Sequence, residues 1–158
     1  MLTRIAFAML GAFILLSAAS STANAHQPSE EFLAERYNNL MDTADRALEL
    51  ANSKAEAFDR EFAEFKVAME SDNALVRLIA KRAMLKYVSD MKQQYHTAKT
   101  HYIEAAHALK RWSDTYGPPE SPARMAIIHR ELQAAIELSG DNFAAASQVR
   151  LEILADYF

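Results

Sequence analysis

Histidine and glutamate side chains near the middle of the chain have a spacing that suits a metal site on a helix. Glu104 precedes His107 by three residues, and His101 precedes Glu104 by three, so neighbouring members of this set can face one ion. A di-iron helical bundle needs a second Glu-x-x-His step and two further inward glutamates, and the sequence does not offer them. We therefore expect Glu104 and His107 to lie on a solvated helix face.

His26 and His101 support two further hypotheses about bound metal or haem. Cleavage of a leader after Ala25 would leave His26 with a free α-amino group, and that amine and the imidazole could chelate copper if a second histidine lay near. His101 could serve as an axial ligand to haem within a helical bundle. The simpler expectation is a frayed N-terminus at His26 and a half-exposed histidine at position 101. We expect no cofactor, and a metal- or haem-binding bundle is the alternative.

Nucleophilic catalysis finds no support in the residue types present. The chain has no cysteine, which also excludes a thiolate metal site. It has no G-x-S-x-G sequence of the kind that presents a catalytic serine. Its carboxylates are expected on the polar faces of helices, where they are solvated. The sequence therefore predicts a protein that is not an enzyme.

A cluster of basic residues is the first candidate for binding a partner. Its members follow i,i+4 spacing: Arg77, Lys81, Arg82 and Lys86. They could hold an acidic partner or anionic lipid headgroups, or they could face the acidic residues that precede them, Glu61, Glu64, Glu70 and Asp72. Leu85, Tyr87 and Val88 stand beside them. The second, weaker candidate is the aromatic pair Tyr157 and Phe158 at the end of the chain.

The first 25 residues have the order of a secretory signal peptide. Arg4 is followed by an apolar run over 5–16, and small residues lead to Ala23-Asn24-Ala25, an A-x-A cleavage site. The apolar run is shorter than the roughly 20 residues that span a bilayer. We expect cleavage between Ala25 and His26, a periplasmic or secreted product with no membrane span, and a single domain over 26–158.

Long helices must position all of these side chains. No glycine or proline occurs between Glu30 and Tyr116, and the only break signal there is Ser71-Asp72-Asn73, which has turn and N-cap chemistry. We predict helices over about 29–71, 74–116 and 121–157. In the first two, apolar residues recur at alternating steps of four and three, for example from Tyr37 to Met69 and from Met84 to Tyr116. This spacing predicts a heptad seam.

The predicted fold class is all-α, an elongated three-helix bundle built on a long antiparallel helical hairpin. Charge supports the pairing of the first two helices. Residues 29–72 hold 5 basic and 12 acidic side chains, whereas residues 74–116 hold 8 basic and 3 acidic. The sequence Ser139-Gly140-Asp141-Asn142 resembles a helix stop, a turn and a new N-cap. A four-helix bundle with a turn at Gly140 is therefore the alternative to one long helix kinked there.

The overall charge of the chain argues against one class of function, nucleic-acid binding. With 17 Lys and Arg against 21 Asp and Glu, the chain has a net charge of −4, which gives no support to nucleic-acid binding. What remains is an exported helical protein that acts through protein–protein interaction, as an adaptor, a chaperone or a component of a secretion or surface apparatus. The sequence does not name the partner, and it leaves self-association open.

Overall fold

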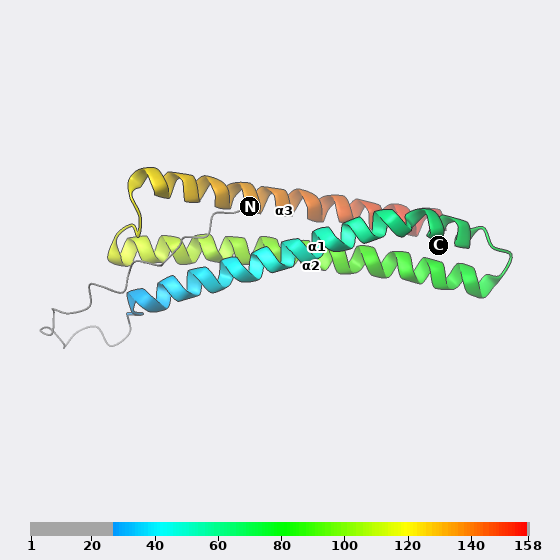
Figure 1. Ribbon diagram of the computed structural model, residues 1–158, viewed down its shortest axis with the longest axis horizontal. Helices are drawn as coiled ribbons and strands as arrows, with labels where there is room; N and C mark the ends of the chain where they lie inside the picture. The colour runs from blue at the N-terminus through cyan, green and yellow to red at the C-terminus, as the bar shows by residue number, and fades with distance from the viewer. Residues whose placement is uncertain (1–26, 158) are drawn as a thin grey trace, which may run out of the picture.

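The computed structural model describes residues 27–157 (Figure 1). The predicted signal peptide over 1–25, together with His26 and Phe158, lies outside these described residues. The described chain forms three helices, α1 Glu30–Met69, α2 Ala74–Tyr116 and α3 Pro122–Tyr157, and contains no strand. The predicted all-α fold class is confirmed.

The ends of the helices follow from local capping chemistry. Ser29 Oγ accepts a hydrogen bond from the backbone N–H of Phe32 at the start of α1, and Asn73 Oδ1 accepts one from Leu75 N–H at 2.9 Å at the start of α2. Each bond satisfies a backbone donor that has no partner within the helix. Gly117 ends α2 with a φ of 90°, a conformation that glycine adopts without a steric penalty. Because these signals are local, the predicted ranges agree with the observed ones to within two residues.

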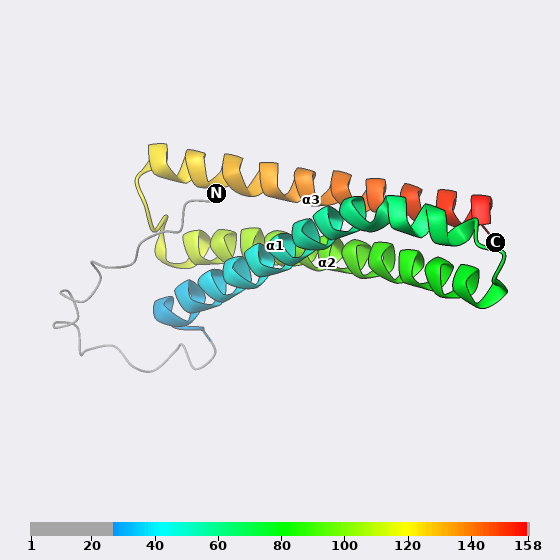
Figure 2. The ribbon, with the colours of Figure 1, turned by 45° about the vertical axis from the view of Figure 1, so that its right-hand side comes forward.

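The helix α2 packs along both α1 and α3. Figures 1 and 2 show three long helices extending along the same axis of the molecule, with α1 crossing α2 obliquely. Three tyrosines on α2 donate hydrogen bonds to polar side chains on α1: Tyr87 to Glu61 at 3.0 Å, Tyr95 to Asn52 at 2.9 Å and Tyr102 to Asp45 at 2.7 Å. Residue numbers rise along α2 as they fall along α1, so these bonds define one register between the two helices.

The core consists of two clusters, and each takes side chains from all three helices. Tyr37, Tyr102 and Leu132 belong to the first cluster, and Phe58, Val88 and Ile153 belong to the second. The positions predicted for the seam of α2 are buried from Met84 to Trp112, and Tyr116 is the exception. It is 45% exposed, and its hydroxyl donates to the carbonyl oxygen of Pro28 at 2.8 Å. The seam of α2 therefore ends at Trp112.

The helix α3 continues through Gly140 without a turn, so the four-helix alternative is wrong. The apolar spacing explains the continuity, because Ala135 and Ala146 are buried on either side of the glycine and Ser139 is fully buried between them. A turn at Gly140 would take one half of this seam out of contact with α2. Packing along the whole helix therefore prevails over the local preference of Ser139-Gly140-Asp141-Asn142 for a turn.

Candidate functional site

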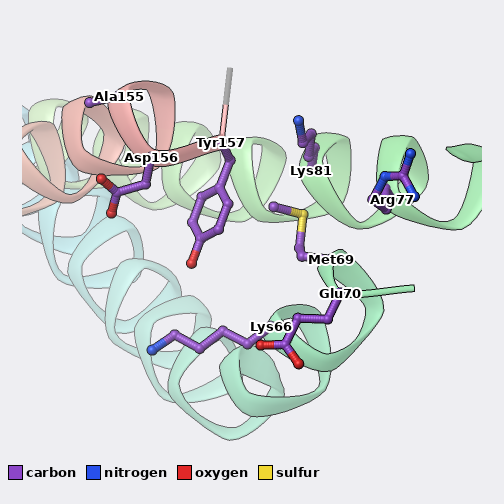
Figure 3. Close-up of a pocket in the computed structure, with 8 residues that line it drawn as sticks. All are labelled: Lys66, Met69, Glu70, Arg77, Lys81, Ala155, Asp156 and Tyr157. Atoms are coloured by element: carbon purple, nitrogen blue, oxygen red, sulfur yellow. The ribbon is translucent and has the colours of Figure 1, made fainter. Parts of the chain in front are cut away.

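The predicted partner-binding residues gather at one end of the molecule, where the turn between α1 and α2 meets the last residues of α3. We call this region, residues 66–86 and 155–157, the turn end. It contains a pocket of about 650 Å³. Figure 3 shows the lining side chains, which come from all three helices: Lys66, Met69, Glu70, Arg77, Lys81, Ala155, Asp156 and Tyr157.

Charges of both signs line this pocket. Lys66, Arg77 and Lys81 bring three cations, and Glu70 and Asp156 bring two carboxylates. Arg77 is also tied to the turn itself, because its Nη1 donates to the carbonyl oxygen of Ser71 at 2.6 Å. This bond satisfies one of the carbonyl groups that follow the end of α1. Arg77 therefore braces the turn, and the pocket as a whole has no strong preference for an anion.

The structure divides the basic cluster between two sides of α2. Arg77 and Lys81 line the pocket with Tyr157, whereas Arg82 and Lys86 are exposed. The Nζ of Lys86 lies 2.8 Å from Oδ2 of Asp90, and the side chain of Lys86 is 75% exposed. That hydrogen bond lowers the pKa of Asp90, but an exposed pair of this kind adds little to stability. The four basic residues thus do not form one continuous binding surface.

The acidic end of α1 is the other expected neighbour of the basic cluster, and Glu70 lines the pocket together with Arg77 and Lys81. The group that reaches Glu61 from α2 is the hydroxyl of Tyr87, which is uncharged, and this hydrogen bond is the main cause of the raised pKa of Tyr87. Exposed Arg82 forms no ion pair with any described side chain. Its charge is therefore available to a partner.

Large apolar side chains are exposed at the turn end. Val67 on α1 is 71% exposed, and on α2 Leu75 is 63% and Ile79 is 59% exposed. Val76 and Leu78 are also exposed, to a smaller extent. Leu75, Leu78 and Ile79 stand three and four residues apart on α2, so they are neighbours on its surface. Single exposed apolar residues are ordinary, but contiguous groups mark interaction sites.

Apolar and basic residues share one outward side of α2. Leu75, Ile79, Arg82 and Lys86 follow steps of four, three and four residues, which place them in one row along the helix. We call the surface formed by Leu75, Leu78, Ile79, Arg82 and Lys86 the docking face. The same row continues through Gln93, Thr100 and Glu104, which are polar and exposed. The apolar part of this row is therefore confined to the turn end.

Sequence reasoning missed the apolar half of the docking face. It singled out Leu85, Tyr87 and Val88 beside the basic cluster, but Val88 is fully buried and Leu85 and Tyr87 are half-buried. A signal was nevertheless present in the sequence. Leu75 and Ile79 fall between the positions that extend the seam from Met84 toward the start of α2, so their apolar side chains had no place in the predicted core.

The candidate metal ligands on α2 lie near the other end of the helix. Nδ1 of His101 is 3.3 Å from Oε2 of Glu104. Glu104 and His107 line a separate pocket of about 190 Å³ that also includes Arg36 and Arg111, and guanidinium groups there oppose the binding of a cation. Across residues 27–157, no three His, Asp or Glu side chains are grouped to hold a metal. His26 lies outside the described residues.

Tyr157 lies in the pocket at the turn end, and Phe158 is outside the part of the chain that the structure describes. Among the described helices, none combines the length and the apolar content needed to cross a bilayer. No family model matches the chain, and no curated protein or solved structure shows significant similarity to it.

Proposed function

We propose that this chain is an exported helical protein that acts by binding another protein, without catalysis of its own. It would work as an adaptor, a chaperone or a component of a secretion or surface apparatus, in the periplasm or outside the cell. The observation that carries this proposal is the exposure of Val67, Leu75 and Ile79 at the turn end. Burying such side chains against a partner would release a favourable free energy of about 25 cal/mol per Å² of apolar surface.

The proposal includes a specific scaffold, an elongated three-helix bundle built on an antiparallel hairpin of α1 and α2. The supporting contacts are the hydrogen bonds from Tyr87, Tyr95 and Tyr102 to α1. A helix of 43 residues such as α2 extends about 65 Å at 1.5 Å per residue. Such a scaffold would hold the docking face at the end of a long rod, away from Trp112 and the start of α3.

Site-specific photo-cross-linking in the intact cell tests the proposal. A photoreactive amino acid at position 79 should give a discrete cross-linked product with another protein. The matched control is position 93, because Gln93 is exposed in the same row of α2 but outside the apolar part. Cross-linked products at position 79 that contain only this chain would contradict the proposal. Equal yields of cross-links to another protein at positions 79 and 93 would also contradict it.

The location is tested by the mass of the exported protein. Cleavage of the signal peptide between Ala25 and His26 should give a soluble product that begins at His26, in the periplasmic fraction or in the medium. Intact-mass spectrometry of that fraction identifies the first residue directly. A full-length chain that stays in the membrane pellet would contradict the proposed location.

A metal- or haem-binding bundle is the second candidate. It would use His26, His101, Glu104 and His107, of which His101 and Glu104 approach each other to 3.3 Å between Nδ1 and Oε2. The exported protein, purified without chelators, should then contain stoichiometric metal or show a Soret band. His101→Ala should remove that signal, whereas His129→Ala should keep it.

A further inference from the structure

We infer that the docking face of α2 binds an amphipathic helix whose apolar stripe is flanked by acidic side chains. This inference rests on the proposed function and adds the chemistry of the partner to it. It is drawn from the arrangement of Leu75, Leu78, Ile79, Arg82 and Lys86, the five residues of the docking face.

The apolar part of the face has the form that another helix recognises. Leu75 stands three residues before Leu78 and four before Ile79, so the three side chains make a ridge on the surface of α2. Ridges of this spacing pack into the grooves of a second helix. A partner helix would present its own apolar residues at i, i+3, i+4 and i+7, which is the usual form of recognition by a helix.

The charge next to this ridge selects an acidic partner. Arg82 and Lys86 follow Leu75 by about 10 and 16 Å along the helix, at 1.5 Å per residue. The first turn of α2 contains no acidic residue, so the positive end of the helix dipole adds to the same potential. No Asp or Glu occurs between Ala74 and Ser89. The next carboxylate, Asp90, pairs with Lys86 at 2.8 Å, so Arg82 carries most of the positive charge that this face offers to a partner. Acidic side chains beside the apolar stripe of a partner would complement this surface, and basic ones would be repelled.

The residues of the turn favour a helix over an anionic membrane as the occupant. Glu70 and Asp72 are exposed, and they lie between Val67 and Leu75 along the chain. Two exposed carboxylates at this end of the molecule would repel a flat anionic surface that approached it. A helix is only about 10 Å wide, so it can follow the docking face on α2 without covering the turn.

Two synthetic peptides test the charge preference directly. Both are 20-residue amphipathic helices with Leu and Ile in one stripe. Glu flanks the stripe in the first peptide, and Lys flanks it in the second. Fluorescence anisotropy with the processed, exported protein in 50 mM NaCl should show at least tenfold tighter binding of the Glu peptide. The difference should shrink at 300 mM NaCl, because salt screens the charges.

Matched variants of the protein assign the binding to the docking face. Ile79→Asp should weaken the Glu peptide at least tenfold, and the double variant Arg82→Glu/Lys86→Glu should reverse the preference between the peptides. Thr100→Asp, at an exposed position in the same row and beyond the length of a 20-residue helix that starts at Leu75, should leave binding unchanged. All substituted positions are exposed, so thermal unfolding followed by circular dichroism should stay within a few degrees of the wild type.

Several outcomes would overturn the inference. Equal affinities for the two peptides, or no binding of the Glu peptide, would exclude an acidic helix as the partner. If the protein sediments with vesicles of anionic lipid and the variant Arg82→Glu/Lys86→Glu does not, the docking face binds a membrane. A dimer of this chain that Ile79→Asp dissociates would assign it to a second copy. If cross-links to another protein at position 79 persist while the Glu peptide fails, the proposed function stands without this inference.

Discussion

The hydroxyl of Tyr102 on α2 donates a 2.7 Å hydrogen bond to Oδ1 of Asp45 on α1. Tyr102 is fully buried, and Asp45 is half-buried at the edge of the interface. Burial, and then the hydrogen bond to Asp45, raise the pKa of Tyr102. A buried hydroxyl without a partner is costly, so a shift in register between α1 and α2 would lose this bond. The pair therefore contributes to the alignment of the two helices as well as to their stability.

Removing this hydroxyl should destabilise the protein measurably. Tyr102→Phe keeps the ring in the core but leaves Asp45 without its donor, and we expect a loss of about 1–2 kcal/mol in the free energy of unfolding. Urea unfolding followed by circular dichroism measures it. The control is Tyr116→Phe, since Tyr116 is 45% exposed and its hydroxyl can bond to water instead. A loss for Tyr116→Phe as large as that for Tyr102→Phe would contradict the argument.

The second core cluster should be sensitive to the loss of Phe58. This side chain is buried, and its ring centroid lies 5.2 Å from that of Phe62. Phe58→Ala removes most of the side chain from a packed interior, so we expect a loss of about 3–5 kcal/mol in the free energy of unfolding. Glu64→Ala, at an exposed position on the same helix, should cost less than about 0.5 kcal/mol. Denaturant unfolding of both variants measures these losses. Equal losses for Phe58→Ala and Glu64→Ala would show that Phe58 lies outside the core.

Stability should fall at alkaline pH because of Tyr37. Burial, and then the nearby carboxylates of Asp45 and Glu131, raise the pKa of Tyr37 from 10.0 to about 12. The fold therefore favours the neutral hydroxyl. The contribution of Tyr37 to the free energy of unfolding is complete below pH 10 and is lost as the pH rises through about 12. A shift of two pKa units corresponds to about 2–3 kcal/mol. Tyr37→Phe should lose less stability than the wild type between pH 10 and 12, as measured by urea unfolding. Parallel pH profiles would contradict this assignment.

Two glycines should respond in opposite directions to alanine. Gly140 lies inside α3, where a Cβ would come within 3.2 Å of the Nζ of Lys99, the mobile end of a long side chain. Gly140→Ala should stabilise the protein by about 0.5–1 kcal/mol, because alanine is the better helix former. At Gly117 a Cβ would meet no described atom within 4 Å, but φ is +90°, so Gly117→Ala should destabilise it. Thermal unfolding of the two variants should give melting temperatures on opposite sides of the wild type.

The sequence by itself determined the helices and most of their buried positions. Ser29, Asn73 and Gly117 act within one turn of the helix ends that they define, so their effect needs no tertiary partner. The seam from Met84 to Trp112 is likewise a property of spacing along a single helix, and it is buried throughout. An uninterrupted apolar period allows only one side of such a helix to face a core.

Tertiary structure decided which residues contact each other across the helices and which stay exposed to solvent. Nothing local pairs Tyr102 with Asp45 or Tyr95 with Asn52, because each pair depends on the register between α1 and α2. Gly140 stays within a helix because both halves of α3 pack on α2, a constraint that its neighbours in the sequence do not contain. The basic cluster is divided, with Arg77 facing the pocket and Arg82 facing outward, because the last turn of α3 covers only one side of α2. Exposure of this kind depends on the shape of the whole molecule, so it cannot be obtained from the spacing of residues along one helix.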